Sequence, residues 1–153
     1  MFILDANVVS ELRKIRGDRA DKNVARWADS VDAVELYLSV ITVQELETGV
    51  LLAERRDPPQ GVMFRTWFEN HVLPAFAGRI LPIDLAVAKR SAALNVPDPR
   101  PAMDSLIAAT ALVHGMTVVT RNVADFESTG VAVLNPWTTD SLIQTNDSQK
   151  RNF

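Results

Sequence analysis

Short runs of apolar and β-branched residues alternate along this 153-residue chain with longer segments that have helical periodicity. The short runs predict five strands: Phe2–Leu4, Glu35–Ile41, Arg79–Pro82, Thr117–Thr120 and Val131–Leu134. The longer segments predict helices at about 7–16, 21–30, 42–57, 60–76, 84–94 and 102–114. Strands that alternate with helices favour a parallel sheet with helices on both faces. We therefore predict an α/β fold, a three-layer α/β/α sandwich with a mainly parallel central sheet.

The chain is long enough for one domain with a hydrophobic core, and no repeat or linker divides it. We expect residues 1–137 to form this domain and residues 138–153 to form a loosely ordered polar tail. No run approaches the roughly 18 apolar residues of a membrane span, and the N-terminus does not match a signal peptide. The absence of cysteine excludes disulfides and fits a reducing compartment, so we expect a cytoplasmic protein without membrane contact.

Four carboxylates fall where a predicted strand ends or a predicted helix begins: Asp5, Glu45, Asp104 and Asp125. Asp5 ends the first strand, and Asp125 lies in the loop after the fourth. Glu45 and Asp104 are each expected in the first turn of a helix, Glu45 as part of the capping-box pattern Thr42-x-x-Glu45. The carboxyl ends of parallel strands and the helix starts that follow them share one edge of the sheet, so we expect the four acids to converge there.

Carboxylates at one place repel each other unless a cation lies among them. Oxygen ligands suit Mg²⁺ or Mn²⁺. With no cysteine and only two histidines, His71 and His114, a zinc site is not expected. A divalent ion lowers the pKa of a bound water and polarises a phosphoryl oxygen, and both effects serve phosphodiester hydrolysis. The acids therefore indicate a metal-dependent site, although Asp5 and Glu45 could also act as helix caps, Asp104 could favour a helix dipole, and Asp125 could be a turn residue.

Four segments of the chain resemble the PIN domain, and most of all the VapC and FitB type of toxin–antitoxin ribonuclease. They are F-I-L-D-A-N, S-V-I-T-V-Q-E-L-E-T-G, A-M-D-S-L-I-A-A-T-A and T-R-N-V-A-D-F, in the order of the family. The resemblance covers residues 2 to about 135. It implies an endoribonuclease that depends on Mg²⁺ or Mn²⁺, that is held inactive by a small antitoxin encoded beside it, and that forms a homodimer.

The motif match also implies roles for individual residues. Asp5, Glu45 and Asp104 take the places of the metal-binding acids, with Asp125 as the fourth acid of the site. Asn7 matches a polar residue near the metal.

The remaining motif matches lie at the end of the predicted strand Thr117–Thr120 and just after it. Thr120 matches a hydroxyl that helps to order the site. Many PIN domains carry an acid where this chain has Asn122, so it stays open whether Asp125 or Asn122 completes the site and whether one or two metals bind. Because the net charge of −3 provides no general attraction to RNA, contact with RNA needs local basic residues, for which Arg121 and Arg100 are the candidates.

Two other interpretations remain open at this stage. A phosphoacceptor receiver domain also has an acidic Mg²⁺ pocket on an α/β sheet, but it needs adjacent acids after the first strand and a lysine after the last. Here Ala6 and Asn7 follow Asp5, no lysine follows the fourth strand, and Asp84 is the only candidate acceptor. The third interpretation is a PIN fold that serves as a catalytically inactive scaffold.

Overall fold

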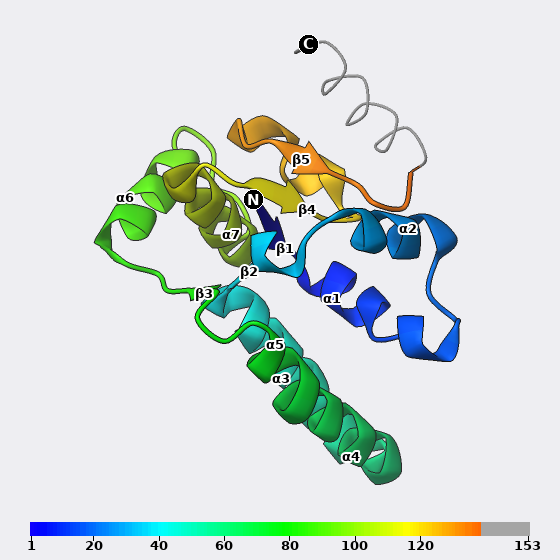
Figure 1. The fold of residues 1–153 in the computed structure, drawn as a ribbon. Coiled ribbons are helices and arrows are strands. Elements are labelled where there is room, and N and C mark those ends of the chain that lie inside the picture. The colour runs from blue at the N-terminus through cyan, green and yellow to red at the C-terminus, as the bar shows by residue number, and fades with distance from the viewer. Residues whose placement is uncertain (139–153) are drawn as a thin grey trace, which may run out of the picture.

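The computed structural model describes residues 1–138 of the chain, so the predicted tail lies, apart from Thr138, outside the described residues. Five strands form one sheet: β1 Phe2–Leu4, β2 Leu36–Ser39, β3 Ile80–Leu81, β4 Thr117–Val119 and β5 Val133–Leu134. The strand order is β3-β2-β1-β4-β5, and every neighbouring pair is parallel. Helices cover both faces of this sheet, which confirms the predicted three-layer α/β/α fold (Figure 1).

The described α-helices are α1 Ala6–Leu12, α2 Lys22–Ser30, α3 Val40–Arg56, α4 Pro58–Trp67, α5 Leu73–Ala75, α6 Leu85–Leu94 and α7 Ala102–His114. Helix α1 is shorter than the predicted segment, and a 3₁₀ turn follows it at Ile15–Gly17. The predicted helix 60–76 begins two residues earlier, with prolines in its first turn, and a π-helical segment at Phe68–Val72 interrupts it. Within residues 1–138 no helix has both the length and the apolar character needed to cross a membrane.

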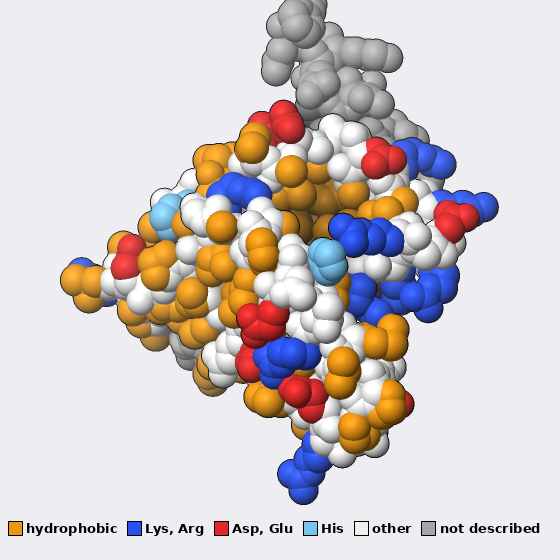
Figure 2. All heavy atoms as spheres, turned by 60° about the horizontal axis from the view of Figure 1, so that its bottom comes forward, with side chains coloured by type: hydrophobic (Ala, Val, Ile, Leu, Met, Phe, Trp, Pro, Cys, Tyr) orange, Lys and Arg blue, Asp and Glu red, His pale blue; other side chains and the backbone are white. Residues whose placement is uncertain are grey.

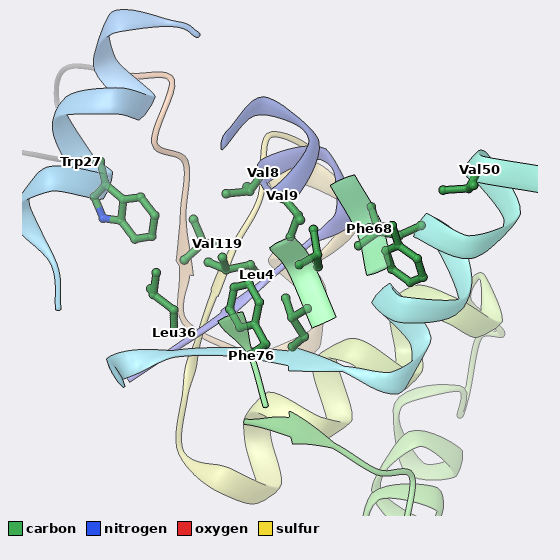
Figure 3. Packing of buried hydrophobic residues seen from close by; sticks show 12 residues of the cluster. Leu4, Val8, Val9, Trp27, Leu36, Val50, Phe68, Phe76 and Val119 are labelled. Carbon is green, nitrogen blue, oxygen red and sulfur yellow. The ribbon is translucent and has the colours of Figure 1, made fainter. Parts of the chain in front are cut away.

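The core has one cluster of buried side chains on each face of the sheet. Successive strand residues point to opposite faces, so Leu4 and Val119 belong to one cluster while Ile3 and Val118 belong to the other. Figure 3 shows the first cluster, in which side chains of α1 and α2 meet those of β1, β2 and the segment that follows α4. The second cluster packs α7 on the opposite face and includes the fully buried Phe126.

The start of α3 differs from the sequence prediction. Helix α3 begins at Val40, and the Ser39 hydroxyl caps it by accepting a hydrogen bond of 3.0 Å from the Ile41 N–H. The Thr42 hydroxyl instead donates to the Leu4 carbonyl at 3.3 Å, at the end of β1. The predicted capping box is therefore wrong, and Glu45 lies in the second turn of α3 rather than in the first.

Helices α3 and α4 form a close antiparallel pair that extends away from the sheet (Figure 1). Gly61 permits the close packing, because a Cβ atom there would lie 2.4 Å from the Cα of Glu54. Arg65 of α4 donates to Glu47 and Glu54 of α3 and to Glu69 of its own segment, at 2.6, 2.7 and 3.2 Å. These contacts hold α3 and α4 together, and the bond from Thr42 to the Leu4 carbonyl ties the start of α3 to the sheet.

Candidate active site

Asp5 lies at the centre of the site, at the carboxyl end of the middle strand. Its backbone N–H continues the β1–β4 pairing by donating to the Val119 carbonyl at 2.9 Å. The side chain is only 6% exposed. Its Oδ1 accepts from the Ala6 N–H at 2.8 Å, and its Oδ2 accepts from the Thr120 hydroxyl at 2.8 Å. Both carboxylate oxygens are therefore held in one orientation at the sheet edge.

Asn7 and Thr120 tie the segment after β4 to the start of α1. The Asn7 amide nitrogen lies 3.3 Å from Oδ2 of Asp5 and 3.4 Å from the Thr120 hydroxyl. The Asn7 amide oxygen accepts from the Arg121 N–H at 3.2 Å, and the Thr120 hydroxyl accepts from the Asn122 N–H at 3.0 Å. Asn7 and Thr120 thus lie beside Asp5, as the motif match implies. The side chain of Asn122 is exposed, and this residue joins the hydrogen-bond network through its backbone N–H.

Two of the other acids, Glu45 and Asp104, have pKa values that burial and neighbouring acid charges raise. Burial, followed by the charges of Asp5 and Asp104, raises the pKa of Glu45 to about 7. Burial, followed by the charges of Asp125 and Asp5, raises the pKa of Asp104. Glu45 and Asp104 are half-buried and Asp125 is exposed. Acids from four distant parts of the sequence therefore share one electrostatic environment at this edge.

The described part of the chain supplies no cation for these acids. Its ion pairs join Lys14 to Glu11, and Arg65 to three glutamates of the α3–α4 pair, and none includes an acid of the site. Repelling carboxylates beside amide and hydroxyl oxygens are the donor set that suits Mg²⁺ or Mn²⁺.

The arrangement is not a closed metal cage. Within residues 1–138, no group of three or more acidic or histidine side chains forms a ready-made metal site. Mg²⁺ is commonly held by one or two carboxylates with waters completing its shell, so the donors fit an ion bound in that open manner. The assignment of Asp5, Glu45 and Asp104 as metal ligands stays a prediction.

The two arginines proposed to contact RNA have different surroundings. Arg121 is exposed beside the Asp5 network, and its guanidinium lies 5.2 Å from the ring centre of Trp137. The guanidinium of Arg100 is engaged by the chain itself, because it donates to the Leu94 carbonyl and to Ser128. Arg121 is thus the better placed of the two for a phosphate.

Sequence reasoning did not single out the groove that begins at Glu45. Two adjoining cavities of about 240 and 220 Å³ lie between α1 and the helices α3–α5, and Arg13 and Trp67 line both. The guanidinium of Arg13 lies over the rings of Phe64 and Trp67, at 4.6 and 5.8 Å from their centres. Figure 2 shows hydrophobic side chains lining a hollow, with basic side chains beside it. Its signals in the sequence are apolar residues of α1, such as Val9 and Leu12, which could serve the core, a dimer or an antitoxin groove, and the aromatic residues on α4.

Comparison with known proteins finds one protein family and several relatives that match most of the chain. The family model of the PIN domain matches residues 2–131. The chain is 42% identical over 142 residues to VapC ribonuclease Y4jK of Sinorhizobium fredii, a match that covers 90% of this chain and 98% of that protein. It is 41% identical over 142 residues to toxin FitB of Neisseria gonorrhoeae, covering 90% and 99%.

Solved structures agree with these sequence matches. The crystal structure of FitAcB from Neisseria gonorrhoeae superposes with a TM-score of 0.80 at 39% identity and covers 90% of this chain and 99% of the matched chain. The structure of FitAB bound to an IR36 DNA fragment gives a TM-score of 0.79 at 38% identity, with coverage of 90% and 96%. The sequence resemblance is thereby confirmed, and the chain belongs to the PIN domain family.

Proposed function

We propose that this chain is a divalent-metal-dependent endoribonuclease and the toxin of a type II toxin–antitoxin pair. The observation that carries the proposal is the state of the sheet edge: Asp5 is buried and held there by the Ala6 N–H and the Thr120 hydroxyl. Burial, followed by acid charges that include that of Asp5, also raises the pKa of Glu45 and of Asp104. Relatives at about 40% identity over nearly the whole chain are named a VapC ribonuclease and a toxin, which supports the same activity.

The residues of the site have separate tasks in this proposal. Asp5, Glu45 and Asp104 would hold the metal, and Asn7 and Thr120 fix the carboxylate of Asp5. A bound Mg²⁺ or Mn²⁺ would supply an activated water and a polarised phosphoryl oxygen. Because the pKa of Glu45 is about 7 without metal, we expect Glu45 to release a proton when the ion binds. Arg121, exposed at the same edge, is proposed to contact a phosphate of the RNA.

The activity is tested with purified protein and a mixed RNA substrate on denaturing gels. We expect cleavage with Mn²⁺ or Mg²⁺, no cleavage with EDTA, and loss of cleavage in Asp104→Asn. Absence of cleavage with either metal, or equal cleavage by the variant, would overturn the proposal. The receiver interpretation has less support, because the Asp84 carboxylate caps α6 by accepting from the Val87 N–H at 2.9 Å. Incubation with acetyl phosphate and intact-mass analysis tests it, and no added phosphoryl group is expected.

An antitoxin segment is proposed to occupy the groove between α1 and α3–α5. The groove is mostly apolar, with Leu12 and Trp67 in its lining, and Glu45 lines the cavity nearest the acids. A segment bound there would also cover the site. The test is co-purification with the product of a short adjoining reading frame. We expect Leu12→Arg to lose the complex, and we expect Leu52→Arg, at an exposed position on α3, to keep it. A homodimer is proposed as well, and light scattering of the purified protein would measure it.

A further inference from the structure

The side chain of Arg100 joins three segments of the chain. Its Nε donates to the Leu94 carbonyl at the end of α6, at 2.7 Å. Its two Nη atoms donate to Ser128, one to the hydroxyl and one, at 3.0 Å, to the carbonyl. Its backbone N–H donates to the Asn95 amide oxygen at 2.7 Å. This is the forked geometry for which a guanidinium is suited and a lysine is not.

The segments that Arg100 joins carry two of the four acids. Arg100 directly precedes Pro101, the residue before α7, and Asp104 lies in the first turn of that helix. Ser128 belongs to the 3₁₀ turn Glu127–Thr129, which follows the 3₁₀ turn Val123–Asp125 that ends in the fourth acid.

A second contact reinforces the first on the α7 side. The Asn95 amide nitrogen donates to the Ser91 carbonyl at 2.8 Å and to the Ser105 hydroxyl at 3.2 Å. Ser105 is the neighbour of Asp104 and is almost fully buried. Pro101 provides no side-chain cap for α7, and the contacts of Asn95 with Ser105 and with the Arg100 N–H link the end of α6 to the start of this helix.

The guanidinium does not pair with either acid directly. Within residues 1–138 no ion pair includes Arg100, so its influence on Asp104 and Asp125 would act through the positions of the two segments. The segment of Asp125 has an independent anchor in the fully buried Phe126. Removal of Arg100 would therefore loosen the link between this segment and the start of α7 without releasing the segment from the core.

We propose that Arg100 is a positioning residue that sets the placement of Asp125 against Asp104 for metal binding. This inference rests on the proposed function, because it assumes that the acids hold a divalent ion. It also replaces the predicted role of Arg100 as an RNA contact. Residues that orient metal ligands through hydrogen bonds change affinity by roughly 10- to 100-fold. Since Arg100 touches neither acid, we expect about a 3- to 10-fold weaker Mn²⁺ affinity in Arg100→Ala.

The experiment measures free Mn²⁺ by electron paramagnetic resonance during titration of the full chain without RNA. The variants are Arg100→Ala, Arg100→Lys, Ser128→Ala, Asp125→Asn and the double variant Arg100→Ala/Asp125→Asn. Arg90→Ala, at an exposed position on α6, is the matched control. We expect wild-type affinity for the control, weaker binding for Arg100→Ala and Arg100→Lys, and a smaller loss for Ser128→Ala, which keeps the carbonyl acceptor.

The double variant separates positioning from general damage to the fold. If Arg100 acts through Asp125, the double variant binds Mn²⁺ no more weakly than Asp125→Asn alone. Wild-type affinity in Arg100→Ala, or full addition of the two losses, overturns the inference while the nuclease proposal stands. Weaker RNA binding with unchanged Mn²⁺ affinity also overturns it and restores the substrate-contact role. If the wild-type chain binds no Mn²⁺ and cleaves RNA in EDTA, metal dependence itself fails, and the inference fails with it.

Discussion

The hydroxyl of Thr120 donates a hydrogen bond of 2.8 Å to Oδ2 of Asp5, across 115 positions of sequence. Both side chains are buried at the ends of neighbouring parallel strands, β1 and β4. The same hydroxyl accepts from the Asn122 N–H, so it orders the segment after β4 as well as the carboxylate. The central acid is thus oriented by the sheet itself, before any ion or substrate is present.

Replacement of Thr120 by valine removes the donor that fixes Oδ2 of Asp5. A hydrogen bond to a charged group contributes more than a neutral one, so we expect a loss of about 1–2 kcal/mol in unfolding free energy. We also expect about a tenfold loss of RNA cleavage, because the carboxylate loses its orientation. Urea unfolding and a cleavage assay measure the two effects. Thr120→Ser keeps the hydroxyl and should keep most of the activity; a Thr120→Ser variant as damaged as Thr120→Val would refute the role of the hydrogen bond.

Asp5→Asn tests the charge of the central acid separately from its shape. The new amide can still accept from the Ala6 N–H and donate to the Thr120 hydroxyl, so we expect cooperative unfolding to persist. Cleavage should fall by about 100-fold or more, because a metal ligand is neutralised. Asp84→Asn is the matched control, since Asp84 also precedes a helix and Asn caps helices about as well as Asp. An equal loss in both variants would mean that the effect comes from capping.

The raised pKa of Glu45 predicts a pH-dependent stability of the metal-free protein. The pKa of Glu45 is about 7 in the folded state, against an ordinary value of 4.5 that applies to the unfolded chain. Between pH 4.5 and pH 7 the folded state therefore binds a proton that the unfolded state has released. The favourable contribution of this proton is full below pH 4.5 and is lost as the pH rises through 7. At pH 8 we therefore expect Glu45→Gln to stabilise the apoprotein by about 1–2 kcal/mol, after allowance for solvent screening at this half-buried side chain.

The gain from Glu45→Gln should shrink towards pH 5, where the folded wild-type protein already carries the proton. Urea unfolding in EDTA at both pH values measures the difference. Glu35→Gln, at an exposed position before β2 that takes part in none of the ion pairs of residues 1–138, provides the control. A gain that is the same at pH 5 and pH 8 would show that the charge of Glu45 is not opposed by its neighbours.

Gly61→Ala tests whether the close approach of α3 and α4 is required. The added Cβ atom would meet the backbone of Glu54 at 2.4 Å, so the two helices would have to separate. We expect destabilisation of about 1–3 kcal/mol. Gly49→Ala is the matched control, because a Cβ atom there meets nothing within 4 Å, and in a helix it should stabilise by about 0.5–1 kcal/mol. Equal stability of the two variants, measured by thermal unfolding, would contradict the packing described for this pair.

The sequence was informative where a local pattern decides the structure. The apolar run before Asp5 forms strand β1, as predicted. The helical pattern around Asp104 places this acid in the first turn of α7, also as predicted. Alternation of strands and helices then fixes the shared edge, because parallel strands present their carboxyl ends together. The fold could therefore be predicted from residue pattern alone, and the joint binding of a metal by the acids stays a prediction.

The sequence was misleading where a contact between distant residues determines the local structure. Both Ser39 and Thr42 could cap α3, and the choice falls to Ser39 because the Thr42 hydroxyl bonds the Leu4 carbonyl on another strand. The contact between Arg100 and Ser128 likewise joins positions 28 apart, and no local motif indicates it. The π-helical turn at Phe68–Val72 keeps both of these residues in the core, which neither helical periodicity nor proline placement predicts.

We propose that Asp5, Glu45 and Asp104 share one divalent ion at the carboxyl edge of the sheet. Crystals grown with Mn²⁺ and measured near the manganese absorption edge test it directly, because anomalous scattering locates the ion independently of the protein. We predict an anomalous peak within coordinating distance, roughly 2.0–2.3 Å, of carboxylate oxygens of this set, and no such peak in crystals of Asp104→Asn. A peak bound elsewhere, or none at saturating Mn²⁺ in a protein that still cleaves RNA, would contradict it.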